Sequence, residues 1–157
     1  RALGNRSIIA SPTFSDMIDK INGSIKKRPK YQPFCPSCLE EERDRLFSVS
    51  YSNKHMTAAF RLKPIFQSDL PAACHVDLTA RPQFVTKLDN SNYYKLLLEV
   101  KKLCGYGVLI NTSFNKHGRT IVRTANDAIV DFIDCQLDFM ILGEYLITIK
   151  NDAPTRL

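Results

Sequence analysis

The chain has 157 residues, enough for one domain with its own core, and its 44% hydrophobic and 24% charged residues are typical of a globular protein. No apolar run approaches the ~20 residues of a membrane-spanning helix, and no signal-peptide pattern is present. The formal net charge of +6 favours anionic ligands such as phosphates, nucleotides or nucleic acid. A basic surface that serves only solubility is the alternative.

Two further totals bear on where the chain works. It begins with Arg1 and not with Met, so we expect it to be a piece of a longer protein. Five cysteines, an odd number, argue against a disulfide framework and indicate a reducing cytoplasm.

The first thirty residues contain two basic clusters. Arg1 and Arg6 surround a glycine, which indicates a phosphate-contacting turn or, alternatively, an exposed basic terminus. Lys26 and Arg28 lie two apart, so in an extended segment they would share a face and could clamp one phosphate. A solvated basic run is the alternative. Between the clusters, Ser11 and Pro12 predict a helix over 12–22 that Gly23 ends.

The middle of the chain predicts short elements. Residues 31–38 look irregular, and Cys35 and Cys38 have metal-ligand spacing without the second pair that a zinc site needs, so we expect two thiols and no metal. We expect a short helix over 39–47, a strand within 55–62, a short strand over 73–77 and a loop over 78–82. Arg81 in that loop is a candidate anion contact. His75 and Asp77 are interpreted as a structural hydrogen-bonded pair.

The last third is more regular. Asn90 or Ser91 caps a helix that runs to about Cys104 and ends at Gly105. A capping-box variant at Thr124 opens a second helix to about Cys135. Residues 139–142 and 145–149 form a hairpin, and 151–157 is a polar tail.

The stretch 108–115 is the one most suggestive of function. It starts as a buried β-branched strand and ends in Asn111, Thr112, Ser113 and Asn115, so it would present fixed hydrogen-bonding groups at a strand tip that binds an anion or a nucleotide. An ordinary polar turn is the alternative. Mixed strands and helices without repeats predict a single domain of the α/β (α+β) class.

These marks resemble a known family. Lys26-Lys27-Arg28 and Ser113-Phe114-Asn115 fit the Lys-x-Arg … Ser-x-Asn arrangement of YrdC-like domains. Arg1–Ser7, His75–Arg81 and Ile110–Asn115 look like the C-terminal part of NodU-type O-carbamoyltransferases. The resemblance covers residues 1–150.

The resemblance implies a curved, open, mixed sheet with flanking helices and an enzymatic role. Such a domain binds ATP, with Mg²⁺, and carbamoyl phosphate, and it forms carbamoyl adenylate. An actin-like N-terminal domain of the same protein, which carries iron, then transfers the carbamoyl group to a hydroxyl of a small molecule. This chain would hold only the adenylate-forming part. The acceptor molecule cannot be told from it.

Site residues follow from the matched motifs. Lys26 and Arg28 would hold carbamoyl phosphate and the ATP phosphates, and Ser113 and Asn115 would bind the phosphate or carbamoyl group. As further phosphate contacts the resemblance implies Arg1, Arg6 and Arg81. The sequence departs from the family pattern at Leu78, where glycine is usual, at Pro82, and at Cys35 and Cys38.

A nucleic-acid-binding module is the alternative function, because YrdC-like folds also take part in tRNA threonylcarbamoylation and the chain is basic. Aromatic residues interleaved with the basic ones are not evident, so we do not expect nucleic acid as the partner. We expect no membrane partner either.

Overall fold

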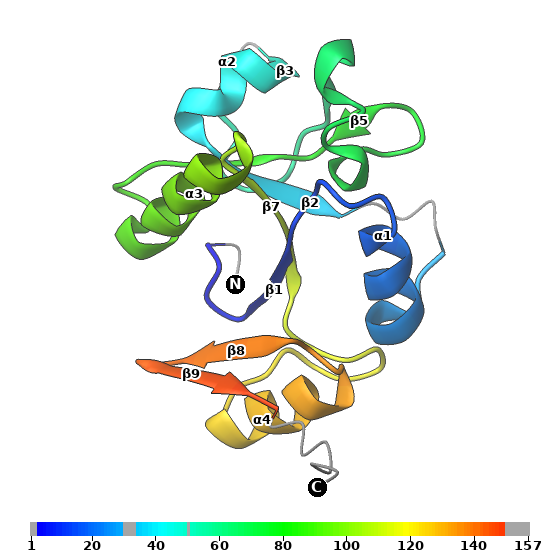
Figure 1. Cartoon of the computed structure of the whole chain (residues 1–157), viewed down its shortest axis with the longest axis vertical. Coiled ribbons are helices and arrows are strands. Elements are labelled where there is room, and N and C mark those ends of the chain that lie inside the picture. The colour runs from blue at the N-terminus through cyan, green and yellow to red at the C-terminus, as the bar shows by residue number, and fades with distance from the viewer. Residues whose placement is uncertain (1–2, 30–33, 50, 150–157) are drawn as a thin grey trace, which may run out of the picture. The chain divides into compact units, whose positions relative to one another are not determined.

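The computed structural model describes residues 3–29, 34–49 and 51–149. The chain divides into two compact units, Arg1–Ser113 and Phe114–Leu157. Helices and strands alternate within the described ranges, and the largest sheet is open and mixed. The predicted mixed α/β class is therefore confirmed (Figure 1).

The first unit is built on a four-stranded sheet with the strand order β1-β7-β2-β6. The strands are β1 (Ser7–Ala10), β7 (Val108–Ser113), β2 (Cys35–Leu39) and β6 (Gln83–Val85). β1 and β2 both run antiparallel to β7, and β6 runs parallel to β2. A second, three-stranded sheet consists of β3 (Phe47–Ser48), β4 (Phe60–Leu62) and β5 (Thr79–Ala80).

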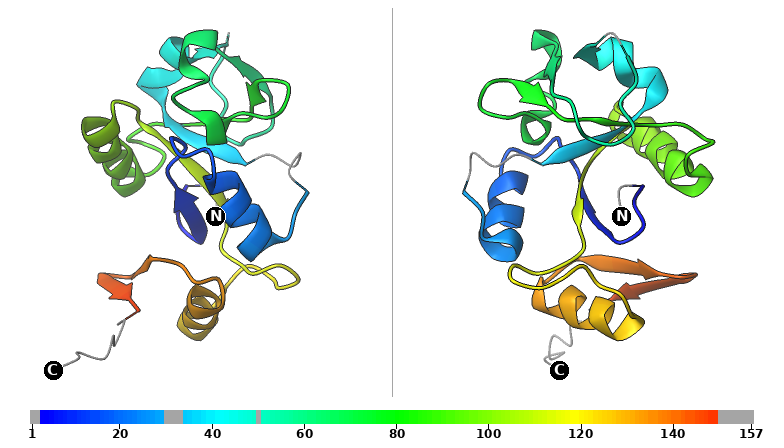
Figure 2. Two further views of the ribbon diagram at one scale, coloured as in Figure 1. Left: turned by 45° about the vertical axis from the view of Figure 1, so that its right-hand side comes forward. Right: turned by 180° about the vertical axis from the view of Figure 1, so that it is seen from behind.

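The two faces of the four-stranded sheet bury different clusters, because successive strand residues point to opposite faces. Cys38, Phe84 and Val108 pack with residues of the smaller sheet, such as Leu62. Leu39, Val85 and Leu109 pack instead against Tyr93 and Leu97 of α3. The sheet is thus covered by α3 on one face and by the three-stranded sheet on the other, as the rear view of Figure 2 shows.

Helix α3 (Ser91–Cys104) begins and ends as its sequence predicts. The Asn90 side chain accepts hydrogen bonds from the main-chain nitrogens of Asn92 and Tyr93, each over 3.1 Å. Gly105 ends the helix in a left-handed conformation with φ 82°. The short helix predicted over 39–47 is also present, as a 3-10 turn (Glu40–Glu42) followed by α2 (Arg43–Leu46).

The second unit contains α4 (Ala125–Asp134) and the hairpin of β8 (Phe139–Leu142) and β9 (Tyr145–Thr148). Thr124 and Asp127 form the capping box, which satisfies donors at the start of the helix. α4 contacts β8, so the helix and hairpin form one small layer pair. Both elements were predicted.

The helix predicted over 12–22 is wrong at both ends. The Ser11 hydroxyl does not cap a helix but accepts a hydrogen bond from the Thr13 main-chain nitrogen over 3.3 Å, in a local turn. α1 begins at Met17 and ends at Lys20, and a π-helix, η1 (Ile21–Lys26), continues directly from it. The glycine expected to end the helix lies inside η1, where nothing would contact an added Cβ.

The middle of the chain differs from prediction where side chains close turns. Within 55–62 only Phe60–Leu62 is a strand, because the Asn53 carboxamide oxygen accepts from His55 and Thr57 and bends the chain there. Residues 73–77 form no strand. Two short 3-10 helices, Pro64–Phe66 and Pro71–Ala73, precede that turn, and β5 begins inside the predicted loop.

The segment predicted as irregular before residue 39 holds the strand β2, in the middle of the sheet. Pro36 is tolerated there because the ladder with β6 begins only at Ser37, so β6 needs no N–H from the proline.

Candidate anion-binding site

The polar end of β7 divides into a structural part and an accessible part. Asn111 is buried, and its amide nitrogen donates to the Ser37 hydroxyl over 3.0 Å. The Ser37 hydroxyl in turn donates to the Gln83 side chain over 3.0 Å. These bonds join β7, β2 and the start of β6, so Asn111 links three strands of the sheet.

Lys26 meets Ser113 at the end of β7. Its ammonium donates to the main-chain oxygen of Ser113 over 2.6 Å and to the hydroxyl over 3.2 Å. The lysine is only 2% exposed, although it is the last residue of η1 and lies 87 residues away in sequence. A cation held at the tip of a central strand gives this unit a fixed positive charge where a phosphate could bind.

Arg6 lies next to the same strand end. Ser7 pairs with Ser113 in the β1–β7 register, and Arg6 is the residue just before it, with an exposed side chain. The turn that leads to Arg6 is fastened to α3, because the Asn90 amide donates to the Leu3 carbonyl over 3.1 Å and Gly4, with φ 78°, lies against the Tyr93 ring. Arg1 lies outside the described residues.

The prediction that Arg28 and Lys26 share one face of an extended segment is wrong. Lys27 adopts a left-handed conformation with φ 46° at the end of η1, and this reverses the chain between the two basic residues. The main-chain nitrogen of Arg28 then donates to the Asn22 carbonyl over 3.2 Å. Arg28 is therefore half-buried beside the π-helix, whereas Lys26 is buried.

Arg81 follows β5, and its loop is built around Thr79. The Thr79 hydroxyl donates to the Asp77 carboxylate over 2.7 Å and lies 3.2 Å from His75 Nδ1. His75 and Asp77 are thus joined through Thr79, which belongs to the matched motif His75–Arg81 but was not predicted to have a role. Burial lowers the pKa of His75, and the Arg81 charge lowers it further, against a raising effect of Asp77.

Two nitrogen atoms in this loop are buried and lack hydrogen-bond partners within the described part of the chain, Arg81 Nε and His75 Nε2. Buried polar atoms in native proteins are nearly always hydrogen-bonded, so both atoms are suited to a ligand. Leu78 in the same loop has φ 64°, a left-handed conformation that glycine adopts without strain.

Asn115 belongs to the second unit. Its amide nitrogen donates to the main-chain oxygens of Lys116 and Arg119, over 3.1 and 2.8 Å, and these bonds close the turn that carries Gly118. Its assignment as a ligand-binding residue stays a prediction.

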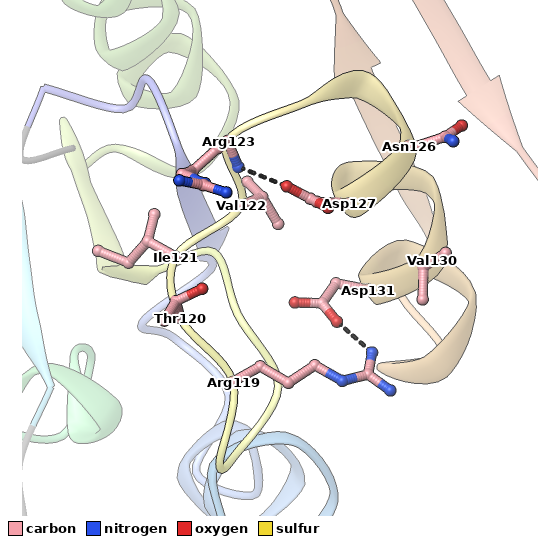
Figure 3. A pocket seen from close by; sticks show the side chains of 9 residues that line it. All are labelled: Arg119, Thr120, Ile121, Val122, Arg123, Asn126, Asp127, Val130 and Asp131. Carbon is pink, nitrogen blue, oxygen red and sulfur yellow. Dashed lines mark hydrogen bonds and ion pairs between the residues drawn. The ribbon is translucent and has the colours of Figure 1, made fainter.

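A pocket in the second unit lies between the loop 119–123 and α4, and Figure 3 shows the side chains that line it. The Arg119 guanidinium donates hydrogen bonds to the carboxylate of Asp131 over 2.5 Å and to that of Asp134 over 2.6 Å. The second Asp131 oxygen accepts from the Lys116 main-chain nitrogen over 3.1 Å. Because Arg119 is engaged by two carboxylates, the pocket is less suited to a phosphate than the strand end at Ser113.

None of the five cysteines forms a disulfide bond. Burial raises the pKa of Cys38 well above its usual range. Within the described ranges, no group of three or more His, Cys, Asp or Glu side chains could hold a metal ion.

The first unit is a mixed α/β domain whose central strand ends beside a buried lysine. Residues 1–149 match the family described as Carbamoyltransferase C-terminus. The chain belongs to this family, which confirms the resemblance seen in the sequence.

Relatives of the chain are longer proteins. It is 61% identical over 150 residues to Uncharacterized protein MJ1058 of Methanocaldococcus jannaschii, an alignment that covers 96% of this chain and 25% of that protein. It is 38% identical over 157 residues to Nodulation protein NolNO of Sinorhizobium fredii, covering 98% and 23%. It is 38% identical over 125 residues to Nodulation protein U of the same organism, an alignment that covers 80% of this chain and 22% of that protein. The chain thus spans about a quarter of the length of these relatives.

None of the helices in the described ranges is both long enough and apolar enough to cross a lipid bilayer.

Proposed function

We propose that this chain is the part of an O-carbamoyltransferase that binds ATP and carbamoyl phosphate and forms carbamoyl adenylate. The observation that carries the proposal is the buried ammonium of Lys26, held against Ser113 at the end of the central strand. Family membership supplies the reaction class. Free thiols fit a reducing cytoplasm as the place of the reaction.

The chemistry needs charge neutralisation more than proton transfer. Water first cleaves carbamoyl phosphate to carbamate and inorganic phosphate. A carbamate oxygen then attacks the α-phosphorus of ATP, its new O–P bond forms, and pyrophosphate leaves. Both steps gather negative charge, which fixed cations stabilise. Lys26 provides such a charge. Arg28 follows it two residues later, and Arg6 precedes Ser7, which pairs with Ser113 in the sheet.

The remaining residues have supporting roles in the proposal. Arg81 presents its unpartnered guanidinium nitrogen to a phosphate. Arg1 and Asn115 complete the set that the family motifs imply. In this proposal an actin-like N-terminal domain with iron, in a longer protein, transfers the carbamoyl group to a hydroxyl of a small-molecule acceptor.

The test is binding of Mg-ATP and carbamoyl phosphate to the 157-residue chain by calorimetry. Lys26→Met should weaken binding of either ligand by about tenfold or more, the equivalent of losing one charged contact. Lys27→Met is the matched control, because it removes the same charge from the exposed neighbour and should leave binding unchanged. The proposal fails if the folded wild-type chain binds neither ligand, or if both variants behave alike.

Release of pyrophosphate is the second measurement. It should require ATP and carbamoyl phosphate together and should fall in Lys26→Met. Release from ATP alone at the same rate would contradict adenylate formation.

A further inference from the structure

The π-helix η1 carries a second buried polar side chain besides Lys26. Asn22 is 2% exposed, as is Lys26, and it lies four residues earlier. A π-helix turn closes between residues five apart, so residues four apart lie on nearly the same side. Single π-turns are rare and occur frequently at functional sites. Asn22 and Lys26 therefore belong to one side of one unusual turn.

The Asn22 carboxamide makes no hydrogen bond within the described part of the chain. Neither its nitrogen nor its oxygen has a hydrogen-bond partner there. Its main-chain oxygen is occupied, since it accepts from Lys27 and Arg28, but these bonds need no particular side chain. A leucine of similar shape would fill the same space without leaving polar atoms unpaired, so packing does not explain an asparagine.

The chemistry of the two atoms indicates the kind of group that satisfies them. A carboxamide offers one acceptor and one donor side by side in a plane. A carbamoyl group, O=C–NH₂, offers the complementary pair, so the two can form a double hydrogen bond. In carbamoyl phosphate that group is joined to the phosphate through one oxygen, and the Lys26 cation lies one turn along on the same side. An adenine edge has a similar pattern, but the ribose separates it from the phosphates.

We propose that Asn22 is the residue that binds the carbamoyl group of carbamoyl phosphate and so distinguishes this substrate from other acyl phosphates. The inference rests on the proposed function and adds to it a residue that no family motif named in the sequence. Lys26 holds the phosphate end, and Asn22 reads the NH₂ and carbonyl of the other end. Because Asn22 is covered in the structure, binding requires the side chains over it to move.

Acetyl phosphate is the discriminating probe, since it replaces the NH₂ of carbamoyl phosphate by a methyl group. A site that hydrogen-bonds an N–H rejects the analogue that lacks it. The wild-type chain should bind carbamoyl phosphate about tenfold or more tightly than acetyl phosphate, measured by calorimetry. The Asn22→Leu variant should bind carbamoyl phosphate and acetyl phosphate with affinities within roughly twofold of each other. Asn92→Leu, at an exposed asparagine of α3, is the matched control and should keep the preference.

Four outcomes overturn the inference. If Asn22→Leu keeps the wild-type preference, Asn22 does not read the group. If it loses a preference for ATP over GTP instead, it reads the base. If wild type binds both acyl phosphates equally, the inference fails while the proposed binding function stands; if wild type binds neither, both fail.

A measurement on the wild-type chain tests the inference even if the Asn22→Leu variant does not fold. The side-chain NH₂ signal of Asn22 in a ¹⁵N spectrum should shift when carbamoyl phosphate is added, and it should not shift with acetyl phosphate or inorganic phosphate. The variant itself should unfold at the wild-type temperature or above, because it removes unpaired buried polar atoms. A signal that responds alike to all three ligands contradicts the proposal.

Discussion

Lys26 donates to both oxygens of Ser113, the carbonyl over 2.6 Å and the hydroxyl over 3.2 Å, and so joins the end of the π-helix to the end of the central strand. The two bonds have different consequences for mutation. The carbonyl bond survives any side-chain change at position 113, whereas the hydroxyl bond depends on the serine. A substitution there therefore tests the ligand-binding role with little disturbance of the fold.

Ser113→Ala should lower the free energy of unfolding by only about 0.5–1 kcal/mol, the net worth of one hydrogen bond. It should weaken binding of Mg-ATP or carbamoyl phosphate by roughly tenfold, because the hydroxyl is lost where the phosphate would bind. Denaturant unfolding and calorimetry give the two values. Ser48→Ala, at an exposed position of β3, is the control. Equal binding by both alanine variants would remove Ser113 from the site.

The left-handed conformation of Leu78 gives a second prediction. Its φ of 64° costs a branched side chain about 1 kcal/mol or more, and the sequence resemblance already marked this position as one where glycine is usual. Leu78→Gly should therefore raise the free energy of unfolding, by up to about 1 kcal/mol after the extra chain entropy of glycine is subtracted. The two main-chain bonds of Leu78, to His75 and Leu62, are kept.

Val76→Gly separates relief of strain from a general effect of glycine in this loop. Val76 is 84% exposed and is not among the residues with positive φ, so its replacement should only add chain entropy and lower stability by about 0.5–1 kcal/mol. If the two glycine variants change stability in the same direction, strain at Leu78 is not significant.

The elements that the sequence predicted well are those fixed by nearby residues. The Asn90 cap and Gly105 define α3, and the Thr124 capping box defines the start of α4, because each signal acts within one turn of helix. The continuous burial of the first four residues of β7 was likewise predicted from its apolar start. In each case a few neighbouring side chains determine the local backbone.

The candidate site was predictable only in part, because it depends on contacts between distant residues. The motif brought Lys26 and Ser113 together correctly, although nothing local showed that Lys26 ends a π-helix or that Lys27 reverses the chain. Asn22 escaped notice because an asparagine in a helical pattern becomes unusual only once its burial is known. Asn111 was grouped with the ligand-binding residues, but its partner Ser37 is supplied by another strand.

The carboxylate of Asp89 gives a prediction about pH. Hydrogen bonds from Thr86 and Lys54 lower the pKa of Asp89 from 3.8 to about 2. A carboxyl whose pKa is lowered by folding stabilises the fold above its unfolded pKa, and that stabilisation is lost as the pH falls through the folded value. The contribution should therefore be present above about pH 4 and should disappear between about pH 4 and 2.

The carboxyl ¹³C shift of Asp89, followed against pH, measures this directly. In Thr86→Val, which removes the hydroxyl that donates over 2.7 Å, the pKa of Asp89 should move back toward its ordinary value. The gap in stability between wild type and Asp89→Asn should also narrow as the pH is lowered from 7 to 2. A midpoint for Asp89 near 3.8 in the wild-type chain would refute the account.

Asp131 offers a test of the second unit by itself. This buried carboxylate accepts from Arg119 and from the Lys116 main-chain nitrogen, and so fastens the loop before α4 to the helix. Asp131→Ala should lower the free energy of unfolding by about 2–3 kcal/mol, because two charge-assisted hydrogen bonds are lost and the main-chain donor is left unpaired. Asp134→Ala, which removes the partly exposed partner of Arg119, should cost about 1 kcal/mol or less. Hydrogen exchange at Lys116 should accelerate in the first variant only, and equal effects of the two variants would show that the buried bond to Lys116 does not stabilise the loop.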